Sequence, residues 1–146
     1  MKNLRALFLF GFLMLGMSLY AQKTTITQKE LPSAAQSFIT NNFSGQKVSS
    51  VIKEVEYKMK TEYEVYFENR MKVEFDGDGN WKEVDGKKTE IPTGFIPAPI
   101  VNYVKKNFPT EKITQIEKKR SKYEIDLSNG LELVFDLNGN FLKIDD

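Results

Sequence analysis

The sequence predicts an α+β fold: a tandem duplication of an α-β-β-β-β unit, each copy a helix packed on a four-stranded antiparallel sheet. The stretch from Tyr63 to Trp81 returns from Tyr123 to Phe141, with every equivalent position shifted by 60 residues. A repeat of fixed period indicates one supersecondary unit used twice. Each copy also opens with apolar residues at helical spacing and continues with alternating apolar and polar residues, which is typical of half-buried strands.

A helix is expected over residues 31–43 and again over residues 96–108. The two segments align at an offset of 65, and the aligned apolar positions have the spacing of one buried helical stripe. These positions are Leu31, Ala35, Phe38, Ile39 and Phe43 in the first copy, and Ile96, Ile100, Tyr103, Val104 and Phe108 in the second. Pro32 and Pro97 suit the first turn of a helix, where the missing N–H costs nothing.

Four strands are expected after each helix. In the first copy they lie near residues 47–55, 63–67, 71–75 and 81–85, and the last strand of the second copy covers 141–145. Asn129-Gly130 predicts a two-residue type I′ hairpin turn, whereas Asn69-Arg70 requires a non-glycine residue to accept positive φ. The offset falls from 65 to 60 along each copy, so the first copy carries about five extra residues near Tyr57 to Glu62, at a hairpin tip.

The predicted organisation is a signal peptide (1–21), a first repeat (22–85), a linker (86–95) and a second repeat (96–146). Lys2 and Arg5 precede an apolar run that ends at residue 20, which is the layout of a secretory signal. The run is shorter than the roughly 20 apolar residues of a membrane span, so a cleaved signal is preferred to an uncleaved anchor. We therefore expect a periplasmic or secreted protein with no membrane span after cleavage. Because each repeat is small for independent stability, the two are expected to pack together.

Composition excludes several classes of function. The chain has no cysteine and no histidine, which removes lipobox anchoring, cysteine nucleophiles, Ser-His dyads and most zinc sites. Lysines are interleaved with glutamates, and the run Lys118-Lys119-Arg120 is interpreted as a solvated strand end, so no nucleic-acid surface is predicted. Carboxylates are many, but no pair has a spacing that indicates acid–base catalysis. We predict no catalytic residues, no cofactor, no metal and no enzymatic activity.

Residues 76–80 and 136–140 resemble the opening of a calcium loop, with side-chain oxygens at the first, third and fifth positions. An EF-hand also needs glycine at position six and a bidentate glutamate at position twelve, but position six is Trp81 or Phe141. The preferred interpretation is a β-turn in which Gly79 and Gly139 take positive φ, and calcium binding is not expected.

One candidate partner-binding patch is expected on the uncovered sheet face. Tyrosine and tryptophan are favoured as interface anchors. The patch consists of Tyr57, Tyr66, Lys72, Glu74, Trp81 and Lys82. The alternative is that Trp81 covers the sheet edge or the joint between the copies.

The Leu-Pro helix that ends in Asn-Phe, followed by Tyr-Glu-Val, Asn-Gly and Phe-Asp-x-Asn-Gly-Asn-Phe, resembles the PepSY-like, β-lactamase-inhibitor-like exported bacterial proteins. The resemblance implies the duplicated helix-and-four-strand unit and no known enzymatic activity. The chain lacks the cysteines of the inhibitors and shows no recognisable inhibitory loop. We expect an exported, non-enzymatic binding module that holds a protein or peptide on its sheet face. The alternative is an inhibitor of a secreted or periplasmic hydrolase, of protease or β-lactamase type, which would use the extra residues 57–61; an enzyme, the third class, would need a deep pocket with convergent polar groups.

Overall fold

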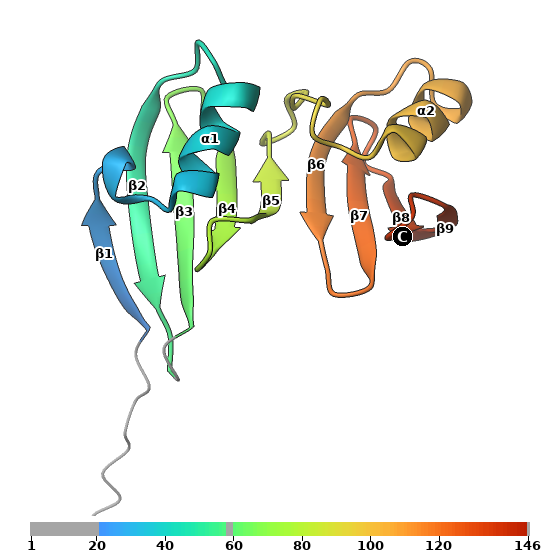
Figure 1. The fold of residues 1–146 in the computed structure, drawn as a ribbon. Coiled ribbons are helices and arrows are strands. Elements are labelled where there is room, and N and C mark those ends of the chain that lie inside the picture. Colours follow the sequence, from blue (N-terminus) through green and yellow to red (C-terminus); the bar gives the residue numbers. More distant parts are fainter. Residues whose placement is uncertain (1–20, 58–59, 146) are drawn as a thin grey trace, which may run out of the picture.

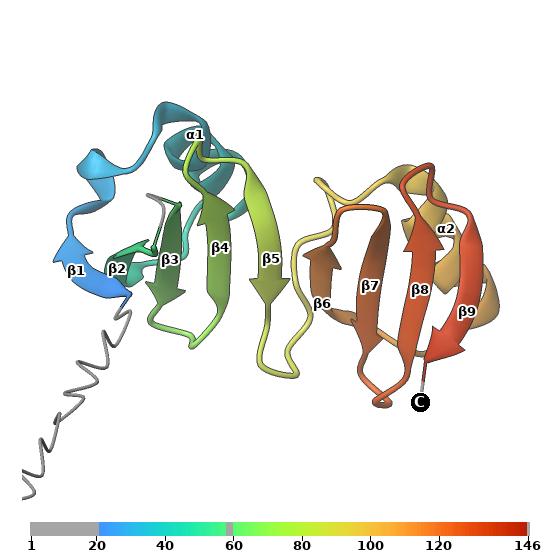
Figure 2. The same cartoon turned by 90° about the horizontal axis from the view of Figure 1, so that it is seen from below.

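The computed structural model describes residues 21–57 and 60–145, so the predicted signal peptide lies outside the described residues except for Ala21. The described chain forms one antiparallel sheet of nine strands, arranged in chain order from β1 to β9. Both helices lie on the same face of this sheet (Figures 1 and 2). The elements are β1 (Gln22–Ile26), the 3₁₀ turn η1 (Gln28–Glu30), α1 (Ser33–Asn42), β2 (Val48–Val55), β3 (Thr61–Phe67), β4 (Lys72–Asp76), β5 (Trp81–Asp85), α2 (Ala98–Asn107), β6 (Ile113–Lys118), β7 (Lys122–Leu127), β8 (Glu132–Asp136) and β9 (Phe141–Asp145).

Each helix is one or two residues shorter at its ends than the apolar stripe predicts. Pro32 and Pro97 are the N-cap residues rather than members of the first turn. Both helices stop at an asparagine, and the amides of Asn42 and Asn107 donate hydrogen bonds to the carbonyls of Phe38 and Tyr103, which satisfies a backbone acceptor in the last turn.

The sheet contains one strand that the sequence did not predict. All five residues of β1 pair antiparallel with β2. The segment Gln-Lys-Thr-Thr-Ile has no alternating apolar pattern, and four of its five residues are exposed. Its strand conformation therefore depends on the edge of β2, which is a long-range contact that periodicity does not report.

The turn at Asn129-Gly130 is not the predicted type I′ turn. Gly130 has φ +89°, while Asn129 is not among the residues with positive φ. The Gly130 amide donates to the Leu127 carbonyl, and the Leu127 amide donates to the Leu131 carbonyl, each at 2.9 Å. This is a three-residue loop that ends in a left-handed residue. Arg70 holds the equivalent position at φ 70°, as the sequence required of a non-glycine residue.

The β4–β5 turn lies directly under the start of α1. Gly79 has φ +87°, and a Cβ atom there would come within 2.8 Å of the Pro32 Cβ and 2.9 Å of the Ala35 amide nitrogen. Gly139 repeats the arrangement under α2, with φ +84° and the Pro99 Cβ at 2.9 Å. Glycine is needed here both for the positive φ, as predicted, and for the close approach of helix and turn.

The two halves join through β5 and β6, so the sheet is continuous across the middle of the chain. Val84 lies opposite Ile116 in this pairing, with Glu83 opposite Glu117 on one side. The 86–95 segment is fixed to the second half because the Ile91 amide donates to the Ile113 carbonyl at 3.0 Å and the Ile91 side chain is buried.

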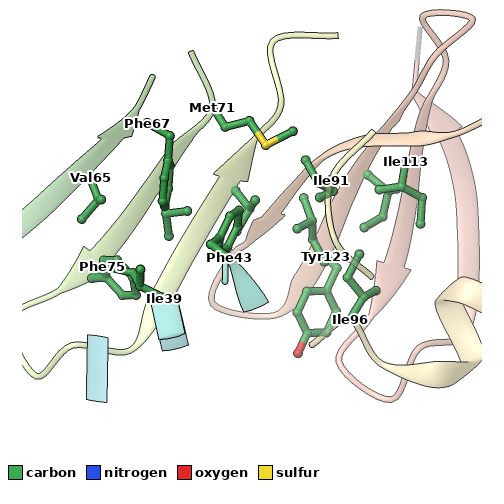
Figure 3. Close-up of a cluster of buried hydrophobic side chains, with 14 of the residues drawn as sticks. Ile39, Phe43, Val65, Phe67, Met71, Phe75, Ile91, Ile96, Ile113 and Tyr123 are labelled. Carbon is green, nitrogen blue, oxygen red and sulfur yellow. The ribbon is translucent and has the colours of Figure 1, made fainter. Parts of the chain in front are cut away.

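One hydrophobic cluster runs under both helices. Figure 3 shows Ile39 of α1 and Phe43, which follows the helix, close to Phe67 and Phe75 of the sheet, and the Phe43 and Phe67 rings stack with centroids 4.9 Å apart. In the second half, Tyr103 stacks on Phe141 at 4.6 Å. Because this cluster is continuous across the joint between the halves, each half buries more apolar surface than it would alone.

Candidate binding face

The face of the sheet opposite the helices is left uncovered by the elements of the described chain, as Figure 2 shows. We call it the open face. Side chains alternate between this face and the core. On β3, Val65 and Phe67 are buried under α1, while Glu64 and Tyr66 point to the open face and are half-buried.

Five glutamates form a row across the open face, one on each strand from β3 to β7. In this glutamate row each member lies directly opposite the next in the strand register. The members are Glu64, Glu74, Glu83, Glu117 and Glu124. Like charges directly opposite each other destabilise a sheet, so the row requires compensation from neighbouring cations.

Lys72 supplies the compensation in the first half. Its ammonium lies 2.6 Å from a Glu74 oxygen and 3.6 Å from a Glu83 oxygen, and only 16% of its side chain is exposed. Burial alone would lower the pKa of Lys72, but the hydrogen bond to Glu74 and the charge of Glu83 raise it above its usual value. Lys72 therefore stays charged at any pH the protein meets.

Two further lysines form ion pairs with the glutamates in the second half of the row. Lys119 lies 2.6 Å from Glu117 and 3.5 Å from Glu124, and Lys122 lies 2.6 Å from Glu124. The hydrogen bond from Lys122 lowers the pKa of Glu124 below its usual value. Lys119 belongs to the basic run at residues 118–120, which lies at the end of β6 and in the following turn.

Glu83 lies in the middle of the row, and the Lys72 ammonium is 3.6 Å from its carboxylate. Burial raises the pKa of Glu83 above its usual value; Lys72 opposes this shift, while the charges of Glu74 and Glu117 add to it. The Gln115 amide donates a hydrogen bond of 2.8 Å to Glu83. Glu74, Glu83 and Glu117 therefore occupy neighbouring register positions at the centre of the open face, where a further positive charge would be stabilising.

A second acidic group follows the glutamate row on the second half. Asp126 lies opposite Glu132, and Glu132 lies opposite Asp145. Burial, together with neighbouring carboxylates, raises the pKa of both Asp126 and Glu132. These three carboxylates line a hollow of about 790 Å³ with Lys88, Thr114 and the β7–β8 turn. Nothing in the sequence pattern distinguishes these carboxylates from other surface ones, although Asp126 holds the position of Tyr66 at the repeat offset of 60.

Tyr66 lines a separate hollow in the first half. Its hydroxyl donates to Glu64 at 3.0 Å, and burial followed by this contact raises the pKa of Tyr66. The hollow has a volume of about 400 Å³ and is completed by Lys23, Thr24 and Thr25 of β1. Because β1 was not predicted, this hollow could not be found from the sequence.

The structure brings four of the six predicted patch residues to one face and separates the other two. Tyr66, Lys72 and Glu74 lie on the open face in neighbouring register positions. Lys82 joins them, with its ammonium 2.5 Å from Glu62. Tyr57 lies beyond the end of β2 in the β2–β3 turn, and 66% of it is exposed. Tyr66 is five residues further along β3 than Thr61, the first residue of that strand.

Trp81 lies on the opposite side of the sheet, in the core between the halves. Its ring is 6.3 Å from that of Phe38, 5.1 Å from that of Phe95 and 6.2 Å from that of Tyr123. The placement of Trp81 in the patch is therefore wrong, and its alternative role at the joint between the copies describes what is observed.

The reason is a β-bulge at Lys82. The register passes from Glu74↔Glu83 to Phe75↔Trp81, so one extra residue stands on β5. A bulge resets the alternation of side chains, which puts Trp81 on the side of Phe75 and Lys82 on the side of Glu83. The same shift between Val134 and Phe135 puts Phe141 in the core of the second half.

The two Asp-x-x-Gly-Asn segments form turns closed by their own carboxylates. Asp76 Oδ1 accepts the amides of Asp78 at 3.0 Å and Asn80 at 2.9 Å. In the second turn, hydrogen bonds from Asn140 lower the pKa of Asp136. Across residues 21–57 and 60–145, no group of three or more acidic side chains is placed to hold a metal ion. In the same part of the chain, neither α1 nor α2 is long and apolar enough to span a membrane.

The sequence and the fold place the chain in a known protein family. The family described as "Putative beta-lactamase-inhibitor-like, PepSY-like" matches residues 17–65 and 61–143. The chain belongs to this PepSY-like family.

Solved structures of three relatives have the same fold. A protein from Bacteroides thetaiotaomicron described as "putative calcium-regulated periplasmic" is 44% identical, with a TM-score of 0.81 over 85% of this chain and 97% of the relative. A "putative periplasmic protein" of the DUF2874 family from Bacteroides vulgatus is 37% identical, with a TM-score of 0.80 over 86% of this chain and 98% of that one. A second Bacteroides vulgatus protein, described as periplasmic and of unknown function, is 36% identical, with a TM-score of 0.80 over 86% and 100%. Among curated proteins, none matches the chain.

Proposed function

We propose that the protein is an exported, non-enzymatic binding module that holds a positively charged segment of a protein or peptide on its open face. The glutamate row carries this proposal. Five carboxylates stand in line on a face that the described elements leave uncovered, with Glu83 at the centre between Glu74 and Glu117. Since such a row costs stability, a function in binding explains its presence better than a role in folding does.

The other parts of the proposal rest on the sequence and on the relatives. Export follows from the predicted signal peptide and agrees with the description of three relatives as periplasmic. The absence of histidine and cysteine supports a non-enzymatic role. We also infer that residues 22–85 and 96–146 are two copies of one unit, because each contains a helix followed by four strands with the same glycine under the helix.

The proposal is tested by capture from the envelope fraction of the producing cell. The bait is the tagged protein, compared with a variant that carries Glu74→Gln, Glu83→Gln and Glu117→Gln. A matched control removes three exposed carboxylates from turns and the linker instead, through Glu56→Gln, Glu68→Gln and Glu90→Gln. We expect partners to be lost from the first variant and kept by the second. Equal recovery by the two variants would contradict the proposal.

Inhibition of a hydrolase is the second candidate, favoured by the first hairpin. The hairpin over residues 48–67 is five residues longer than its counterpart over 113–127, and Tyr57 near its tip is exposed. A panel of secreted proteases and β-lactamases tests this candidate. Inhibition that Tyr57→Ala relieves, with the open-face variant unaffected, would favour it over binding on the sheet.

A further inference from the structure

The two outer edges of the nine-stranded sheet differ in chemistry. The first edge, β1, exposes Gln, Lys and Thr side chains. The last edge, β9, exposes two apolar side chains beside the charged Lys143 and Asp145: Leu142 is 55% and Ile144 44% exposed. Within residues 21–57 and 60–145, no strand pairs with the outer side of β9. An edge strand with unpaired backbone groups and exposed apolar side chains is a template for another strand.

The strand equivalent to β9 in the first half is β5, and its outer edge is paired with another strand. At the repeat offset of 60, Val84 of β5 corresponds to Ile144 of β9. The outer side of β5 is covered by β6, where Val84 lies opposite Ile116 and is fully buried. The polar pair Asp85 and Gln115 flanks this contact on the open face. The register of this junction is thus one apolar pair, Val84 with Ile116, between two polar pairs, Asp85 with Gln115 and Glu83 with Glu117.

We propose that β9 pairs antiparallel with β9 of a second copy of this chain, with Ile144 facing Ile144 across a two-fold axis. This register sets Lys143 of each copy against Asp145 of the other. Both side chains belong to the open face, because their β8 neighbours are Val134 and Glu132. In the single chain they pair only with each other, at 2.8 Å and with both side chains largely exposed.

The charges on β9 favour this register over the one centred on the preceding residue. Centring the pair on Lys143 would set lysine against lysine, which is unfavourable for directly opposite residues. Centring it on Ile144 gives two ion pairs and one apolar contact. The arrangement is isologous and therefore closed, so it leaves the polar β1 edge at both ends and keeps all four helices on one side of the extended sheet. Pairing β9 with β1 of another copy would instead give an open chain of molecules.

The test is sedimentation equilibrium of the protein purified after export, from about 1 μM to about 1 mM, because an interface this small is expected to be weak. We expect a concentration-dependent dimer. Lys143→Asp should weaken association at least about tenfold, since it opposes like charges twice. The double variant Lys143→Asp with Asp145→Lys should restore it, because the exchanged charges are again complementary across the axis.

Ile144→Lys should abolish dimerisation, and Thr24→Lys on β1 should leave it unchanged. Circular dichroism checks that each variant is folded, and the charge-exchanged pair keeps the test valid if Ile144→Lys does not fold. A protein that is monomeric over the whole range would overturn the proposal. A dimer whose association constant is the same for the wild type and the β9 variants would also overturn it, because such a dimer would form through another surface.

Discussion

Gly79→Ala is expected to destabilise the protein by about 2–4 kcal/mol, which is well beyond what its backbone conformation alone would cost. Two effects add at this position. A left-handed conformation is unfavourable by about 1 kcal/mol for alanine, after allowance for the entropy that glycine loses on folding. The new Cβ would also lie 2.8 Å from Pro32 and 2.9 Å from the Ala35 amide nitrogen, so the start of α1 must move.

Gly130→Ala isolates the first effect. Gly130 has almost the same φ, +89° against +87°, but nothing lies within 4 Å of its added Cβ. We expect this variant to lose only about 1 kcal/mol. The difference between the two variants, about 1–3 kcal/mol, then measures the cost of forcing the helix away from the turn.

Urea denaturation followed by circular dichroism gives both free energies of unfolding, with Gly139→Ala as an internal repeat of Gly79→Ala. Equal losses for Gly79→Ala and Gly130→Ala would refute the close packing of the β4–β5 turn under α1. A Gly139→Ala variant that behaves like Gly130→Ala would refute the equivalence of the two turns.

Four further predictions follow from particular contacts. Arg70→Gly should stabilise the protein by about 1 kcal/mol in urea denaturation, because the φ of 70° suits glycine; a loss would mean that the Arg70 side chain has a structural role. Asp126→Asn should raise the unfolding free energy at pH 7 by roughly 0.5–1 kcal/mol. The pKa of Asp126 is higher in the folded state than in the unfolded state, so the free energy of unfolding should fall as pH rises from the ordinary aspartate pKa to the raised one. The Asp126→Asn variant should not show this fall in a pH series. Trp81→Ala should cost about 3–5 kcal/mol as a large-to-small change in the core, whereas Tyr66→Ala on the open face should cost at most about 1 kcal/mol; the reverse order would contradict the assigned faces. Finally, millimolar calcium should leave the melting temperature unchanged, and a rise would reveal binding to the folded state.

Local patterns predicted most of the elements. Both helices and the limits of β5 and β9 follow from apolar spacing and from the Asp-x-x-Gly-Asn turns. The turn after β7 was misjudged because Asn-Gly is compatible with two loop lengths, and only the hydrogen bonds from Leu127 distinguish them.

The candidate site was only partly predictable. Tyr66, Lys72 and Glu74 were found because strict alternation on β3 and β4 assigns their face. Trp81 was misplaced because alternation fails at a bulge, and the bulge at Lys82 has no glycine or proline to signal it. Asp126 and Glu132 were missed because a carboxylate on a polar face looks ordinary until its cross-strand neighbours are known.

The sequence by itself determined the repeat, the two helical stripes, the left-handed glycines and the lack of imidazole and thiol chemistry, since these depend on residue type and local spacing. Tertiary structure alone decided that β1 covers the edge of β2, that β5 and β6 join the halves, and that five glutamates stand in one row. These features depend on which strands are neighbours and in what register. A period of two gives each strand two faces, but it does not specify the strand beside it.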